Sequence, residues 1–148
     1  MKLSPNFTME EFIASETAMR RRIDNSLPPE LLRTAANTAD MMERIRAVLG
    51  DKPIQFTSAY RCQELNRAIG SSDTSDHPKA MAVDFKCPDF GTPFAVATFL
   101  ASQVDQLGIG QLIAEFGSWV HVSTRKPALA ANRVITIDSS GTRIGVVR

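Results

Sequence analysis

The sequence contains two histidines, His77 and His121, and both stand in settings that would suit a metal ion. His77 lies in a polar stretch and is followed seven residues later by Asp84, an aspartate inside an apolar run. Burying a carboxylate without a partner costs several kcal/mol, and a divalent metal ion is one of the few partners that offset this cost. His121 lies in a second apolar run, two residues after Trp119. Two neutral imidazoles and one carboxylate, with a fourth position left for water, are a recurring ligand set of catalytic zinc.

The same three residues allow other interpretations. A histidine in a strand is often only a hydrogen-bonded core residue, and Asp84 could cap a turn. The separation of His77 and Asp84 is not that of a general metal-binding motif. Two histidines and a carboxylate also hold iron in Fe(II) oxygenases, but there the acid follows the first histidine much more closely. From spacing alone, the metal site and the structural interpretation both remain open.

Three motifs in a fixed order favour the metal site over the structural interpretation. They are Thr57-Ser58-Ala59-Tyr60-Arg61-Cys62 with Leu65-Asn66, then Ser75-x-His77-x6-Asp84, and then Trp119-x-His121. Together they resemble the M15 family of zinc D,D-carboxypeptidases and phage L-alanyl-D-glutamate endopeptidases, which act on peptidoglycan stem peptides. The start of the chain, Leu3-Ser4-x-Asn6-Phe7, also resembles the short phage-type members. The resemblance therefore covers most of the chain.

The resemblance assigns roles to four residues. It implies that His77, Asp84 and His121 are the ligands of a zinc ion, Zn2+. It also implies that Arg61 holds a carboxylate or carbonyl oxygen of the substrate. A guanidinium group offers a fixed fork of donors that suits a carboxylate or a developing oxyanion. Without its motif, Arg61 would more often be a solvated surface residue or a salt-bridge partner.

Two positions depart from the family pattern. The glycine that usually stands three residues after the first histidine is Ala80 here, a change that a backbone with negative φ would tolerate. The acid that family members commonly have three residues before the last histidine is replaced by Ser118. The catalytic base therefore has to be sought elsewhere.

Glu115 is the acid nearest to that position. If residues 116–118 form a three-residue hairpin loop, Glu115 pairs with Trp119 and lies on the face of His121, whereas a two-residue loop would point it away. We predict Glu115 as the general base, against the alternative of an ordinary surface carboxylate. Asp76 and Asp89 are the next candidates, because they lie near the metal-binding segment in sequence.

Apolar periodicity and turn residues predict the elements that must position these side chains. The pattern predicts a first short helix from a capping box at Thr8 and Glu11, a loop over residues 20–29, helices over 30–49, 61–69 and 93–104, and strands over 54–57, 81–85, 111–114, 119–123 and 133–137. A hairpin turn is expected at residues 138–141. Because helices come first and strands mostly later, the fold class is α+β, with N-terminal helices packed on a small antiparallel sheet that carries the zinc site.

Composition and charge exclude several classes of protein. The 148 residues are 43% hydrophobic and 22% charged, which is ordinary for a globular protein, and we expect a single M15-like peptidase domain over residues 1–148. A formal net charge of +1 gives no electrostatic argument for a nucleic-acid partner. No apolar run is long enough for membrane insertion. Cys62 and Cys87 fit neither a disulfide framework nor a four-thiolate zinc site, so we expect both to be reduced packing residues.

These observations lead to one functional expectation with two alternatives. We expect zinc-dependent hydrolysis of a peptide bond in peptidoglycan stem peptides, by a monomeric, endolysin-like cell-wall endopeptidase. The alternatives are a D,D-carboxypeptidase and a catalytically weak wall-binding virion protein that retains the fold. The N-terminus has no apolar signal segment. We therefore expect synthesis in the cytoplasm without a signal peptide, and action on the bacterial cell wall after release or virion delivery.

Overall fold

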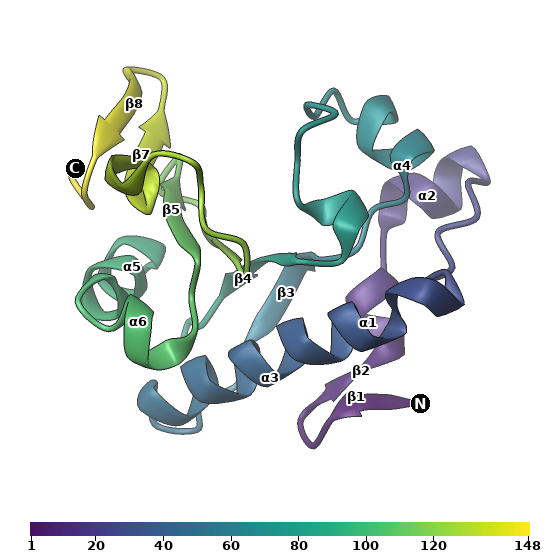
Figure 1. Ribbon diagram of the computed structural model, residues 1–148, viewed down its shortest axis with the longest axis horizontal. Helices are drawn as coiled ribbons and strands as arrows, with labels where there is room; N and C mark the ends of the chain where they lie inside the picture. The colour runs from purple at the N-terminus through teal and green to yellow at the C-terminus, as the bar shows by residue number, and fades with distance from the viewer.

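The computed structural model describes residues 1–148 and has an α+β fold (Figure 1). The helices are α1 (Met9–Ile13), α2 (Glu16–Arg21), α3 (Leu32–Val48), α4 (Gln63–Ala68), α5 (Pro93–Ala101) and α6 (Val104–Leu107), with 3-10 turns η1 (Pro29–Leu31), η2 (His77–Lys79) and η3 (Ala130–Asn132). The strands are β1 (Lys2–Ser4), β2 (Phe7–Thr8), β3 (Gln55–Ser58), β4 (Ala82–Lys86), β5 (Gln111–Glu115), β6 (Trp119–Ser123), β7 (Val134–Asp138) and β8 (Gly141–Ile144).

Six strands form the main sheet, in the order β3-β4-β6-β5-β7-β8. All neighbouring strands are antiparallel except β5 and β7, which are parallel. The expectation of a wholly antiparallel sheet is therefore wrong at one pair. β6 ends beside the start of β5, and the connection after β6, which contains η3, leads to β7 at this same end of the sheet, so β7 runs in the same direction as β5.

Most predicted elements are present, with differences at their ends. The capping box at Thr8 and Glu11 starts α1 as expected. The loop expected over residues 20–29 is partly wrong, because α2 extends to Arg21, with Ser15 capping its first turn. The helix expected over 93–104 is interrupted between α5 and α6, and the sequence pattern gave no sign of β1 and β2.

The core is one cluster of 24 buried apolar residues that joins the sheet to helices from both halves of the chain. From the first half, α3 contributes Met41, Met42 and Ile45, and in Figure 1 it runs along the lower side of the molecule. From the second half, α5 contacts β5 and β6. The sheet is therefore covered by a helix from the second half of the chain as well as by N-terminal helices. Both cysteines are free, as expected, and Cys87 is buried in this core.

The N-terminal hairpin of β1 and β2 is fastened to α3 by one carboxylate. Glu43 accepts hydrogen bonds from Ser4 Oγ at 2.6 Å and from the backbone and side-chain nitrogens of Asn6, both at 2.7 Å. Beside this contact, the ring of Phe7 stacks on Phe56 with centroids 4.9 Å apart. These contacts attach β1 and β2 to the edge of the main sheet. None of the helices combines the length and the hydropathy that a membrane-spanning segment requires.

Candidate metal centre

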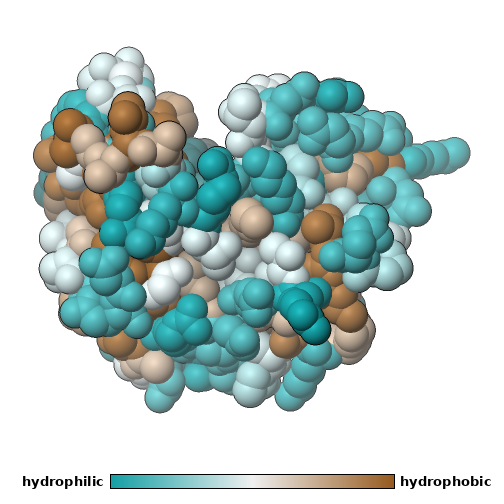
Figure 2. Space-filling model, viewed as in Figure 1, coloured by the Kyte–Doolittle hydropathy of each residue, from teal (hydrophilic) through white to brown (hydrophobic).

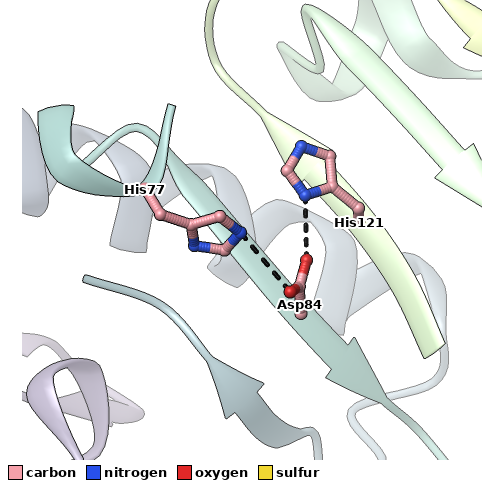
Figure 3. Close-up of side chains that lie close together, drawn as sticks. All are labelled: His77, Asp84 and His121. Carbon is pink, nitrogen blue, oxygen red and sulfur yellow. Dashed lines mark hydrogen bonds and ion pairs between the residues drawn. The ribbon is translucent and has the colours of Figure 1, made fainter. Parts of the chain in front are cut away.

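His77, Asp84 and His121 converge in the structure (Figure 3), although 44 residues separate the first from the last. Asp84 on β4 is the direct cross-strand partner of His121 on β6, and side chains at such positions point to the same face of the sheet. Asp84 Oδ1 lies 2.8 Å from His121 Nδ1, and Asp84 Oδ2 lies 3.4 Å from His77 Nε2. The candidate donor atoms all lie within 4.8 Å of one another.

His77 is held in one tautomer by a backbone contact. It begins η2, and its Nδ1 lies 2.5 Å from the carbonyl oxygen of Ala59. Because a carbonyl can only accept a hydrogen bond, Nδ1 carries a proton, and Nε2 is the ring nitrogen that faces Asp84 and could bind a metal ion. Metal-binding histidines are commonly oriented in this way by a partner on the other ring nitrogen.

The charges of the cluster are coupled. Burial would raise the pKa of Asp84, but hydrogen bonds with His121 and His77 outweigh this and hold its pKa well below the usual value. Burial would lower the pKa of His121, but the hydrogen bond to Asp84 and the charges of Asp84 and Glu115 raise it instead. The carboxylate is thus ionised, as a metal ligand must be, and metal binding through His121 Nδ1 would release a proton.

The donor set and its spacing fit a zinc ion. Donor atoms about 2 Å from zinc in a tetrahedral arrangement lie roughly 3.3 Å from one another. The observed separations of 2.8 and 3.4 Å lie on either side of this value, so small side-chain movements would complete the geometry.

Glu115 lies on the same face as the cluster. Its register partner across the hairpin is Trp119, which confirms the three-residue loop over residues 116–118. Phe116 and Gly117 in this loop both have positive φ, which tight hairpin loops require. Glu115 Oε1 lies 3.9 Å from His121 Nδ1, and its carboxylate has no hydrogen-bond donor of its own. Burial, followed by the charge of Asp84, raises the pKa of Glu115 against the opposing effects of His121 and Arg61.

Arg61 lies beside Asp84. Its Nε donates to Asn66 Oδ1 at 3.0 Å, one terminal nitrogen donates to Ser58 Oγ at 3.1 Å, and the same nitrogen lies 4.0 Å from Asp84 Oδ2. Burial lowers the pKa of Arg61, and the charges of Asp84 and Glu115 oppose this shift. A guanidinium group stays charged under all ordinary conditions, so the pocket keeps one fixed positive charge.

All five side chains line one pocket of about 610 Å³. Ser71 and Ser75 line it on the side of α4, and Phe116 and Trp119 line it on the side of the β5–β6 hairpin. Figure 2 shows the surface hollowed between the part of the molecule that carries α4 and the part that carries β7 and β8. The candidate metal ligands are therefore accessible from solvent on one side, as a catalytic site requires.

The two other candidate bases lie elsewhere. Asp76 accepts hydrogen bonds from Ser123 Oγ at 2.8 Å and from Arg125 Nε at 2.6 Å, so its carboxylate oxygens are occupied. Neither Asp76 nor Asp89 lines the pocket. Of the three candidate bases, only Glu115 lines the pocket.

The expectation for Ala80 is wrong. Ala80 follows η2 and has φ of +60°, in the left-handed region that a residue with Cβ enters at a cost of roughly 1–2 kcal/mol. Its methyl group is fully buried in the core, and its carbonyl accepts a hydrogen bond from Thr38 Oγ1 at 2.7 Å. The turn between His77 and β4 is thus held by packing and this hydrogen bond despite the strain.

Comparison with known families decides the membership of this chain. The family model described as Peptidase M15 matches residues 5–123, which include all five predicted site residues. The chain belongs to the M15 peptidase family. As an M15 peptidase it acts on peptide substrates, and the metal cluster agrees with the zinc dependence that is typical of this family. A search of curated proteins finds no match.

Sequence reasoning did not assign roles to several residues of this M15 peptidase. Asn66 and Ser58 were part of the recognised motif, but only the structure shows that they hold the Arg61 guanidinium. Asn66 is fully buried, and its side-chain nitrogen also donates to the carbonyl of Ser72 at 2.9 Å. The signal that could have revealed it is an amide side chain on the inner face of a short helix, because such a group needs buried partners.

Proposed function

We propose that this M15 peptidase is a zinc-dependent hydrolase of peptide bonds in peptidoglycan stem peptides, of the endolysin-like endopeptidase type. The proposal depends mainly on one observation: two imidazoles and an ionised carboxylate converge in an open pocket whose walls carry Glu115 and Arg61. Stem peptides present carboxylates such as that of D-Glu, and Arg61 supplies a complementary charge.

His77, Asp84 and His121 would hold the metal ion, through Nε2, a carboxylate oxygen and Nδ1 respectively. When bound, zinc polarises the scissile carbonyl and lowers the pKa of water towards neutrality. The Ala59 carbonyl keeps the His77 ring in the required tautomer. The protein therefore needs little rearrangement of its own to bind the ion.

Glu115 is assigned the proton transfer. Its carboxylate accepts a proton from the attacking water and returns it to the nitrogen of the leaving amine. Its raised pKa and its lack of a hydrogen-bond donor both favour this exchange, because an acid tied to strong donors would hold a proton poorly.

Arg61 is assigned the binding of an oxygen of the substrate. Its side chain is fixed by Asn66 and Ser58, so the guanidinium loses little freedom when the substrate binds. It would steady either the oxyanion that forms at the scissile carbonyl or a neighbouring carboxylate.

The proposal includes where the enzyme acts. Synthesis in the cytoplasm followed by release, or delivery with a virion, would bring it to the cell wall. The chemistry also suits a D,D-carboxypeptidase, and the products separate the two activities. An endopeptidase splits the stem peptide into two fragments, one of which has a new terminal amine, whereas a carboxypeptidase releases free D-Ala.

The test is digestion of purified peptidoglycan by zinc-loaded protein, with mass spectrometry of the products. We expect about one zinc ion per chain, new amino groups within the stem peptides, loss of activity after chelation, and recovery when zinc is restored. Zinc-loaded Glu115→Gln protein serves as the inactive control. A protein that contains no zinc, or that digests peptidoglycan unchanged after verified metal removal, would contradict the proposal.

A further inference from the structure

A second cavity continues from the metal pocket. It is a groove of about 870 Å³ between β3 and the segment from Ile13 to Ser26, which includes α2. Four residues, Thr57, Ser58, Arg61 and Ile69, line both the groove and the metal pocket. The two therefore form one continuous depression, with Arg61 at the junction.

One wall of the groove is the free edge of the sheet. β3 is the outermost strand and is hydrogen-bonded only to β4, although α1 and the ring of Phe7 pack against it. No backbone group of residues 55–58 has a hydrogen-bond partner on the side away from β4, and Phe56, Thr57 and Ser58 line the groove. An exposed row of unpaired N–H and C=O groups is a template for an added strand.

The opposite wall is held in place by buried hydrogen bonds. Asn25 donates to the carbonyls of Ile13 at 2.8 Å and Tyr60 at 3.0 Å, and it accepts from the backbone nitrogen of Cys62 at 2.7 Å. This side chain connects the loop after α2 to the chain that leaves β3. The groove is thus formed before any ligand binds, and little ordering free energy is needed on binding.

From these observations we propose that the groove binds the substrate chain on one side of the scissile bond, as an extended strand added to the free edge of β3. This inference rests on the proposed function and specifies how its substrate is held. Addition of a strand reads the peptide backbone through alternating hydrogen bonds and leaves its side chains in pockets. β3 has four residues, and at roughly 3.3 Å per residue it can pair with about four residues of substrate.

The binding site then consists of the metal pocket and the groove together. The fixed charge of Arg61 lies where the groove meets the metal cluster, so an anionic group near the scissile bond would set the register of the added strand. D-Glu in a stem peptide offers such a group. Short peptides would occupy the metal pocket only, whereas longer ones would also gain the β3 edge.

The experiment measures binding, so that it does not depend on turnover. Zinc-loaded Glu115→Gln protein is titrated with a synthetic stem tripeptide and a synthetic stem pentapeptide, and the backbone amide NMR signals of the protein are followed. We expect the pentapeptide to bind about tenfold more tightly and to shift the signals of residues 55–58. N-methylation of alternate amides should remove this gain, and N-methylation of the amides between them should not, because only every second amide faces the strand.

Two variants place the effect in the groove. Ala14 is exposed and lines the groove but not the metal pocket, so Ala14→Trp should fill the groove and abolish the tenfold gain while leaving tripeptide binding unchanged. Thr142→Trp, on exposed β8 at the other end of the sheet, is the control and should change neither affinity. Equal binding of the two peptides, or equal weakening of both by Ala14→Trp, would overturn the inference.

The proposed function and the groove assignment can fail independently of each other. If zinc-loaded wild-type protein cleaves no peptidoglycan but the pentapeptide still binds along β3, the groove assignment stands and the catalytic assignment is wrong. If peptidoglycan is cleaved but binding does not depend on peptide length, the catalytic assignment stands and the groove assignment is wrong.

Discussion

Asp76 and Asp84 are both buried aspartates, at 5% and 7% exposure, yet their surroundings differ in kind. Asp76 is bound by a hydroxyl group, Ser123 Oγ, and by the permanent positive charge of Arg125. Asp84 is bound by two imidazoles, and it faces an open pocket. Imidazoles can lose their protons to the solvent and donate lone pairs to a metal ion, whereas a guanidinium cannot.

The difference shows that burial of a carboxylate does not by itself mark a reactive site. Asp76 precedes His77, and its bond to Ser123 ties η2 to the end of β6, two residues beyond His121. It is a structural carboxylate that fixes the distance between two candidate ligands. Asp84 is itself a candidate ligand, because its partners can be exchanged for a metal ion. The following predictions test this division.

The largest effect is expected for Asp84→Asn. The amide is nearly the same size but a poor zinc ligand, so zinc affinity should fall by at least about 100-fold, more than the loss typical for residues that only support a ligand. Peptidase activity should fall with it. Isothermal titration with zinc and an activity assay measure both. Full zinc content in this variant would assign the metal to other residues.

Glu115→Gln should separate chemistry from metal binding. The variant keeps the size of the side chain but removes its basicity, so turnover should drop by roughly 10² to 10⁴ while zinc content stays at the wild-type level. Metal analysis and steady-state kinetics on the same preparation decide this. Near wild-type turnover would mean that another group accepts the proton, and that a carboxylate without hydrogen-bond donors in this pocket has no catalytic role.

Asp76→Asn should show the opposite pattern to Asp84→Asn. Loss of the charged hydrogen bonds should lower the free energy of unfolding by about 1–2 kcal/mol, because Arg125 is 46% exposed and water replaces part of the interaction. Turnover of the zinc-loaded fraction should stay within a few-fold of wild type. Denaturant unfolding and kinetics measure the two effects, and Ser123→Ala is the matched control for the hydroxyl. A drop in turnover of more than a few-fold in the zinc-loaded protein would mean that Asp76 contributes to catalysis.

The smallest effect is expected for substitution of Glu43, a third carboxylate whose oxygens both accept hydrogen bonds. Burial would raise its pKa, but hydrogen bonds from Ser4 and Asn6 outweigh this and lower it. Because the folded pKa lies below the unfolded value of about 4.3, the stabilisation is present above that pH and is lost as the pH falls through the folded pKa. Glu43→Gln should therefore cost about 1 kcal/mol at neutral pH and progressively less as the pH is lowered towards 3. A difference that does not depend on pH would show that the charge of Glu43 does not contribute.

The sequence by itself determined which residues could carry the chemistry. The spacing of His77, Asp84 and His121 within recognisable motifs identified the candidate ligands and the family, and the hairpin argument placed Glu115 on the face of His121. The family membership and the position of Glu115 were confirmed. The ligands were assigned by the resemblance, whereas the hairpin argument needed only local geometry, because alternation along a strand and the length of a turn follow from neighbouring residues.

Only the tertiary structure decided the rest. The pairing of Asp84 with His121, the contact of Ala59 with His77, and the parallel pairing of β7 with β5 join residues that are far apart in sequence. The positive φ of Ala80 is sustained by burial of its methyl group and by Thr38, a residue 42 positions away. Such features depend on the packing of the whole core, where the free energy of many distant contacts outweighs the preference of any single residue.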